Sequence, residues 1–120
     1  MKYAVVGSRT FDDYAFMEKA LSSYNDITTI ISGGARGADS LAKKYALEHG
    51  LNYVEFPALW DVYGKSAGYL RNNQIVDAAE IVIAFWDGKS KGTRHTIKLA
   101  SDQGKTVHTY WPDNLSVNTF

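Results

Sequence analysis

The sequence contains no cysteine among its 120 residues. Disulfide bonds, thiolate nucleophiles and cysteine metal sites are therefore excluded. The chain also lacks an excess of either charge, because 13 lysines and arginines balance 13 aspartates and glutamates. A nonspecific nucleic-acid binder usually carries a basic excess, so this balance disfavours nucleic acid as a partner without excluding it.

Long apolar runs are missing as well. No segment approaches the length that a membrane span requires, and the apolar run at residues 3–6 is too short for a signal peptide. We therefore expect a cytoplasmic protein with no membrane partner. A length of 120 residues with 45% apolar residues suits a single domain with an ordinary core.

Several familiar catalytic and metal-binding patterns are also absent. The glycine spacing matches neither the Walker pattern nor the nucleophile elbow nor the dinucleotide fingerprint G-x-G-x-x-G. His49 and His108 fall at the end of an expected helix and in an expected strand, which indicates ordinary packing and no cluster of metal ligands. We expect neither a metal nor a cofactor.

Five short apolar runs alternate with segments of helical periodicity. The runs lie at residues 3–6, 28–31, 52–56, 81–86 and 106–110. Such alternation is typical of a parallel α/β sheet, and right-handed crossovers place helices on both of its faces. We predict a Rossmann-like, doubly wound parallel sheet of about five strands, in the order 3-2-1-4-5. It covers residues 1–110, and residues 111–120 are expected to form a C-terminal tail.

Glycine-rich turns follow three of these expected strands. They contain Gly7, Gly33 and Gly92, and the second reads Ser32-Gly33-Gly34-Ala35-Arg36-Gly37-Ala38-Asp39. Glycine lets a ligand approach the backbone, and the helix that follows presents unpaired N–H groups, so such turns often bind phosphate. Because the carboxyl ends of parallel strands share one edge, we expect all three turns to line one crevice. A tight turn without a ligand is the alternative for each.

Side chains suited to phosphate accompany the first two turns. Arg9 and Arg36 could grip a phosphate through paired hydrogen bonds, although Arg9 could instead form a surface ion pair with Asp12 or Asp13. Asp39 could contact a ribose hydroxyl or simply stabilise the first turn of its helix.

The later segments supply aromatic, amide and hydroxyl groups. Trp60 and Tyr63 could stack on a base or cover the core. Burial of Arg71 without partners is unfavourable, so we expect Arg71-Asn72 to face either the crevice or the solvent. Thr93 could bind phosphate or cap its helix, and His95 could exchange a proton near neutral pH.

Five ordered motifs resemble the YspA/YpsA-related branch of the SLOG superfamily. They are Gly7-Ser8-Arg9, residues 32–39, Trp60 to Lys65, Ala67-Gly68 with Arg71-Asn72, and Ser90 to His95. The resemblance covers about Lys2 to Val107. It implies a Rossmann-like domain that binds nucleotide-derived ligands, including relatives of NAD and ADP-ribose, and it makes a homodimer or larger homo-oligomer plausible. The superfamily also contains the Lonely guy phosphoribohydrolases and the DprA-type DNA-binding proteins.

The similarity to the phosphoribohydrolases is partial. Gly92-Thr93 matches the core of their Pro-Gly-Gly-x-Gly-Thr-x-Glu signature, and Arg71 resembles their catalytic arginine, but His95 stands at the glutamate position. A neutral imidazole cannot supply the negative charge of a carboxylate, which weakens the case for hydrolysis. If the protein is an enzyme, the resemblance makes Arg71 and His95 its expected catalytic residues.

We therefore expect a protein that binds a nucleotide-derived small molecule for sensing or sequestration. The ligand would be a phosphorylated nucleoside, an ADP-ribose-type compound or a cyclic nucleotide. Cleavage of a nucleotide N-glycosidic bond and binding of single-stranded nucleic acid are the alternatives. The expected ligand-binding residues are Gly7, Ser8, Arg9, Ser32, Gly33, Gly34, Ala35, Arg36, Gly37, Asp39, Trp60, Tyr63, Lys65, Arg71, Asn72, Ser90, Gly92, Thr93 and His95.

Overall fold

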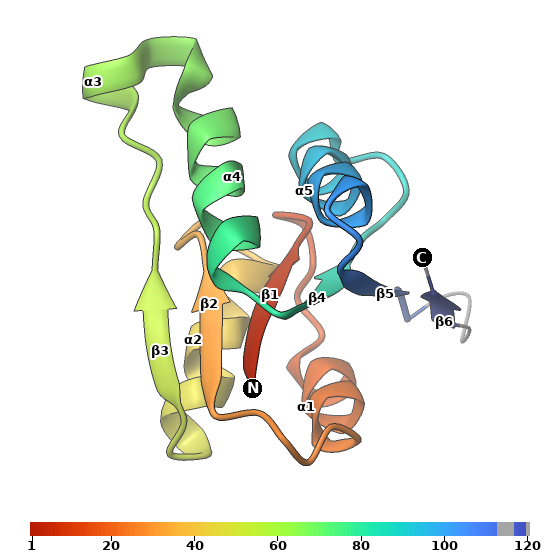
Figure 1. Cartoon of the computed structure of the whole chain (residues 1–120). Coiled ribbons are helices and arrows are strands. Elements are labelled where there is room, and N and C mark those ends of the chain that lie inside the picture. Colours follow the sequence, from red (N-terminus) through yellow and green to blue (C-terminus); the bar gives the residue numbers. More distant parts are fainter. Residues whose placement is uncertain (113–116, 120) are drawn as a thin grey trace.

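A parallel sheet organises the chain in the computed structural model, which describes residues 1–112 and 117–119. The strands are β1 (Lys2–Gly7), β2 (Thr29–Ser32), β3 (Asn52–Glu55), β4 (Ile81–Phe85), β5 (Thr106–Tyr110) and β6 (Val117–Thr119). They lie in the order β3-β2-β1-β4-β5-β6 (Figure 1). The first five strands are parallel, which confirms the predicted fold and strand order.

The sixth strand lies in the segment expected to be a tail. Residues 117–119 pair antiparallel with β5, through the register His108 to Thr119 and Tyr110 to Val117. Residues 113–116 and 120 of that expected tail lie outside the described residues. The antiparallel addition leaves the parallel core unchanged.

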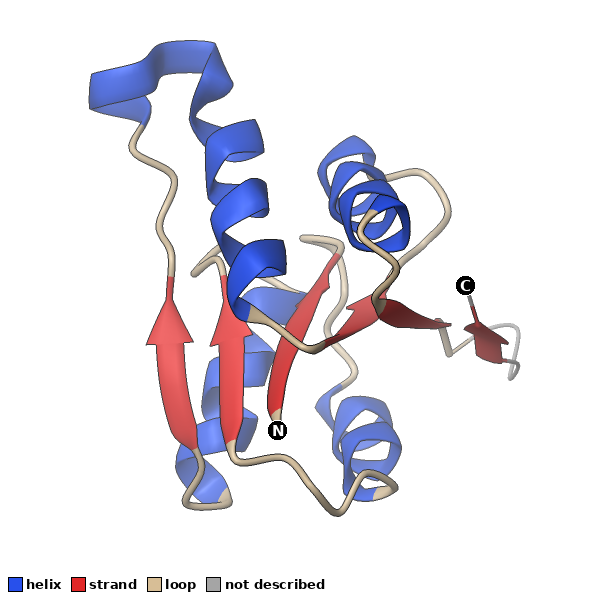
Figure 2. Ribbon diagram, in the orientation of Figure 1, coloured by secondary structure: helices blue, strands red, loops and turns tan. Residues whose placement is uncertain are grey.

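Helices cover both faces of the sheet. The long ones are α1 (Tyr14–Ser22), α2 (Ala38–Glu48), α4 (Ala67–Ala78) and α5 (Lys91–Asp102). Figure 2 shows α1 and α2 on one face and α4 and α5 on the other. The connection after β3 contains the short helix α3 (Trp60–Tyr63) and a 3₁₀ turn at Gly64–Ser66. Within the described residues no helix is both long and apolar enough to span a membrane.

The core consists of two layers, one on each face of the sheet. Val5 and Ile83 pack toward α1 and α2, whereas Ala4 and Val82 pack toward α4 and α5. Successive residues of a strand point to opposite faces, so a strand that is covered on both faces needs apolar residues throughout. This explains why the sequence of β4 shows no alternation with polar residues.

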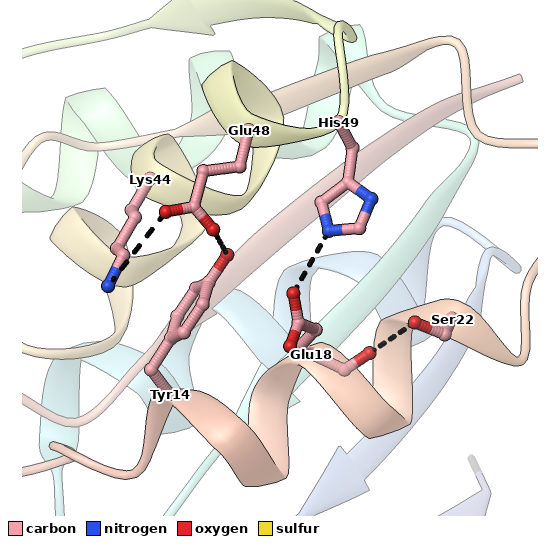
Figure 3. Close-up of polar contacts among 6 residues, drawn as sticks. All are labelled: Tyr14, Glu18, Ser22, Lys44, Glu48 and His49. Atoms are coloured by element: carbon pink, nitrogen blue, oxygen red, sulfur yellow. Dashed lines mark hydrogen bonds and ion pairs between the residues drawn. The ribbon is translucent and has the colours of Figure 1, made fainter.

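Polar contacts join α1 to α2 at the surface of the first layer (Figure 3). The Tyr14 hydroxyl donates to Glu48 Oε1 over 2.8 Å, and His49 Nε2 lies 3.2 Å from Glu18 Oε2. The His49 ring also stacks on Tyr45, with 4.0 Å between ring centroids. His49 is exposed and contacts both Glu18 on α1 and Tyr45 on α2.

We predict that Leu21→Ala lowers the free energy of unfolding by about 2–5 kcal/mol, because Leu21 is fully buried and its truncation leaves a cavity. Leu47→Ala is the matched control, since Leu47 also lies on a helix but is 66% exposed. It should change the free energy by less than about 0.5 kcal/mol. Urea unfolding followed by circular dichroism measures both, and equal effects would show that the first layer is wrongly described.

Candidate functional site

The three glycine-rich turns meet at the carboxyl edge of the sheet. Gly7 ends β1, Gly33 directly follows β2, and Gly92 lies in the first turn of α5 after β4. The strand order reverses between β1 and β4, where the chain turns toward opposite faces of the sheet. A ligand crevice is expected at such a point in an open α/β sheet.

A cavity of about 340 Å³ occupies this crevice. Several predicted site residues line it: Gly7, Ser8, Arg9, Ala35, Asp39, Arg71, Asn72, Ser90, Gly92 and Thr93. Sequence reasoning missed Thr10, Asp87 and Thr96, which also line it. Asp87 could have been found, because it opens the third glycine-containing turn.

A second cavity of about 400 Å³ adjoins the first. Its predicted lining residues are Arg9, Gly33, Gly34, Ala35, Arg36, Trp60 and Arg71. The two cavities share Arg9, Ala35 and Arg71. The two cavities therefore lie side by side across these residues, and we call them together the rim site, with Arg71 between its two halves.

Other predicted residues lie outside the rim site. The buried Ser32 hydroxyl donates to the Val5 carbonyl oxygen over 2.7 Å and so ties β2 to β1. Gly37 lines a third cavity beside α2, which borders Arg9 and Arg36, and Tyr63 lines a fourth against α4, which borders Arg71. Lys65 is exposed in the 3₁₀ turn, and His95 contacts Asn72 rather than lining either half of the rim site.

Ser8 is held by contacts to three parts of the chain and is only 1% exposed. Its N–H donates to the Phe85 carbonyl over 2.9 Å, and its carbonyl accepts from Ala38 N–H over 3.2 Å. Its hydroxyl accepts from Asp87 N–H, also over 3.2 Å. Ser8, one of the expected ligand-binding residues, thus joins β1, β4 and α2 around the first cavity.

The turn between β4 and α5 is shaped by its own side chains. Asp87 Oδ1 accepts from the N–H groups of Lys89 and Ser90, over 2.8 and 2.9 Å. Partial burial acts to raise the pKa of Asp87, but these hydrogen bonds outweigh it and hold that pKa below its ordinary value. Ser90, rather than Thr93, caps α5, because its hydroxyl accepts from Thr93 N–H over 3.5 Å.

Arg71 is partly buried and anchored by two hydrogen bonds. Its NH1 group donates to the Gly33 carbonyl over 2.9 Å, and its Nε donates to Asn72 Oδ1 over 3.1 Å. A Cβ atom on Gly33 would collide with the guanidinium, so glycine is required for this approach. Burial and the neighbouring Arg9 charge lower the pKa of Arg71, while Asp39 opposes them.

Asp39 is the buried carboxylate of the rim site and is only 5% exposed. It accepts a hydrogen bond from Ala35 N–H over 3.2 Å. Burial raises its pKa from 3.8 to about 6, although this hydrogen bond and the Arg71 charge act in the opposite direction. The rim site therefore combines cationic side chains with a carboxyl group that is protonated readily. No cluster of histidines and carboxylates within the described part of the chain is arranged to hold a metal ion.

Sequence comparison finds relatives over most of the chain. Residues 1–63 match the YspA, cpYpsA-related SLOG family. The Gene 61 protein of Mycobacterium phage D29 is 37% identical over 115 residues, which cover 86% of this chain and 90% of that protein.

Two solved structures of DNA processing protein A share the fold. The Streptococcus pneumoniae protein has a TM-score of 0.80 at 24% identity, over 96% of this chain and 52% of its own. The Helicobacter pylori protein has a TM-score of 0.71 at 20% identity, and the match covers 97% of this chain and 67% of that protein. This chain thus spans about half the length of the Streptococcus pneumoniae protein.

One expectation from the sequence is wrong. The balanced net charge disfavoured nucleic acid as a partner, but the Helicobacter pylori protein, which has this fold, binds single-stranded DNA. The prediction failed because the net charge of the whole chain does not show where on the surface the charged side chains lie. Here Arg9, Arg36 and Arg71 gather at the rim site, together with the carboxylates of Asp39, Glu55 and Asp87.

The raised pKa of Asp39 predicts how stability depends on pH. Between its ordinary pKa of about 4 and about 6, the folded chain binds more protons at Asp39 than the unfolded chain does. The contribution of Asp39 to the free energy of unfolding should therefore fall by about 3 kcal/mol as the pH rises through this interval, then level off. Urea unfolding of the native protein and of Asp39→Asn should give a difference with this pH dependence. A difference that is constant with pH would contradict the raised pKa.

Proposed function

Because the chain belongs to the YspA, cpYpsA-related SLOG family, we propose that its rim site binds single-stranded nucleic acid. A backbone phosphate lies between Arg9 and Arg71, and a neighbouring base stacks on Trp60. The observation that carries this proposal is that two neighbouring cavities share both arginines, while Trp60 lines the second cavity. The single-stranded DNA binding of the Helicobacter pylori protein, which has the same fold, supports it.

In this proposal, phosphate recognition depends on the hydrogen bonds that orient the Arg71 guanidinium. Its bonds to the Gly33 carbonyl and to Asn72 fix the plane of the guanidinium and leave its other N–H groups for a ligand. Arg9 is exposed and lines the same cavities, and the influence of its charge on the pKa of Arg71 indicates that the two cations repel each other. A phosphate between them would relieve that repulsion and accept charge-assisted hydrogen bonds from both.

In this proposal, Trp60 recognises the base by stacking on it. Its side chain is 51% exposed, although it lines the second cavity together with Arg9, Arg36 and Arg71. Stacking of a base on an aromatic ring contributes about 1–3 kcal/mol and tolerates any sequence, because every base has a π-face. Binding through Arg71 and Trp60 would therefore depend on the strand being single and not on its sequence.

A nucleotide-derived small molecule is the second candidate ligand. The first cavity alone, at about 340 Å³, is within the range of small-molecule sites, and its wall includes Asp39, Arg71 and Asn72. A phosphorylated nucleoside, an ADP-ribose-type compound or a cyclic nucleotide would fit a sensing or sequestering role there. Hydrolysis has less support, because His95 lies against Asn72 and does not line the first cavity.

The first functional prediction concerns charge at the rim site. We expect Arg71→Ala to weaken binding of an oligothymidylate of about ten nucleotides by about tenfold to a hundredfold, through loss of charge-assisted contacts. Lys19→Ala removes the same charge from α1, which Figure 1 places near the amino ends of the strands, and it should leave affinity nearly unchanged. Fluorescence anisotropy at several salt concentrations measures both variants. Equal losses in the two would indicate a nonspecific charge effect and would contradict the proposed site.

The second functional prediction separates the two candidate ligands. Trp60→Ala should weaken oligothymidylate binding by about fivefold to a hundredfold, while Trp60→Phe retains most of the affinity, because phenylalanine can still stack. Val62→Ala is the control, since Val62 is exposed on the same short helix. Thymidine monophosphate and ADP-ribose are titrated in parallel by calorimetry. If either binds more tightly than the oligothymidylate and is unaffected by Trp60→Ala, the small-molecule candidate replaces nucleic acid.

A further inference from the structure

We propose that His95 is a positioning residue, which acts through Asn72 to hold the Arg71 guanidinium at the phosphate position and does not itself touch the ligand. The inference rests on the proposed function, because it explains how that phosphate contact is kept in place. It differs from the role expected from the sequence, where His95 was a candidate ligand contact or acid–base group.

A chain of hydrogen bonds links the two residues. Arg71 Nε lies 3.1 Å from Asn72 Oδ1 on α4. Asn72 Nδ2 lies 3.1 Å from His95 Nδ1 and 3.3 Å from the Gly92 carbonyl oxygen, both on α5. The Arg71 guanidinium is thereby joined to the opposite wall of the crevice.

The donor and acceptor of each hydrogen bond in this series follow from the groups at its two ends, Arg71 Nε and the Gly92 carbonyl. Arg71 Nε can only donate, so the Asn72 atom that faces it is the oxygen. The Gly92 carbonyl can only accept, so the Asn72 atom that faces it is the NH₂ group. The second proton of that NH₂ group then points to His95 Nδ1, which must accept it and therefore carries no proton.

The environment of His95 is consistent with a neutral ring protonated at Nε2. Burial lowers the pKa of His95, which disfavours the imidazolium form. Its ring meets the Tyr69 ring edge-on, with 4.6 Å between the centroids and 80° between the planes. A protonated Nδ1 would set two donors against each other at the contact with Asn72.

Asn72 depends on this acceptor because it is itself buried. Its side chain is only 6% exposed, and no buried side-chain nitrogen or oxygen within the described residues lacks a hydrogen-bond partner. Removing the His95 acceptor would leave a buried N–H group unpaired, which is unfavourable, and Asn72 would be free to reorient. Arg71 would then keep only its bond to the Gly33 carbonyl.

Three substitutions at His95 distinguish positioning from direct contact. In asparagine the side-chain oxygen takes the place of Nδ1, whereas in glutamine the terminal amide takes the place of Nε2. We expect His95→Asn to bind the ten-nucleotide oligothymidylate within about twofold of the native protein, since it preserves the acceptor for Asn72. His95→Gln and His95→Ala should lose about threefold to tenfold. The opposite order, with glutamine active and asparagine impaired, would show that Nε2 touches the ligand and would overturn the proposal, as would native affinity in all three variants.

A second measurement needs no ligand and so separates this inference from the proposed function. In ¹⁵N-labelled protein, the Arg71 Nε–H resonance should exchange slowly with water in the native chain and in His95→Asn, and faster in the other two variants. Imidazole ¹⁵N shifts of the native protein should show a proton on Nε2 only. Failure of the native protein to bind oligothymidylate, combined with these spectra, would reject the function and support the positioning role. A proton on Nδ1, or rapid exchange at Arg71 in the native chain, would overturn the positioning role whatever the binding result.

Discussion

The rim site depends on the backbone and hydroxyl of Ser8. Its N–H, carbonyl and hydroxyl groups bind β4, the start of α2 and the turn after β4. These bonds fix the distance between the carboxyl ends of β1 and β4, where the chain departs to opposite faces and leaves a crevice. Arg9 follows Ser8 directly, so the same bonds also set the cation at the mouth of the first cavity.

Electrostatics at the rim site arises from local arrangement and not from composition. The chain is neutral overall, yet Arg9, Arg36 and Arg71 line one cavity. Burial works against charge on both Arg71 and Asp39, lowering the pKa of the first and raising that of the second. An anion would offset the repulsion between Arg9 and Arg71, and protonation of Asp39 would remove one of the negative charges that line the first cavity, of which Asp87 is another.

The sequence predicted the fold and the place of the rim site, because both follow from local patterns. The apolar run that became β4 and the glycine turn at residues 32–37 carry signals that need no tertiary contact. The orientation of side chains could not be predicted, since it depends on partners distant in sequence. The hydroxyl of Ser32, an expected ligand-binding residue, donates to the Val5 carbonyl oxygen across the sheet, a contact that the local sequence does not indicate. His95, another expected ligand-binding residue, lies 3.1 Å through Nδ1 from Asn72 Nδ2 on another helix.

The central claim is that the rim site is where a single strand of nucleic acid binds, and backbone amide shifts test it most directly. Oligothymidylate added to ¹⁵N-labelled protein should shift the amide resonances of residues 7–10, 33–37 and 60–63 and of the first turn of α5. Residues of α1 and the amino ends of β1 and β2 should be unaffected. Shifts confined to α1 and to the amino ends of β1 and β2, or no shifts at saturating oligothymidylate, would contradict binding at the rim site.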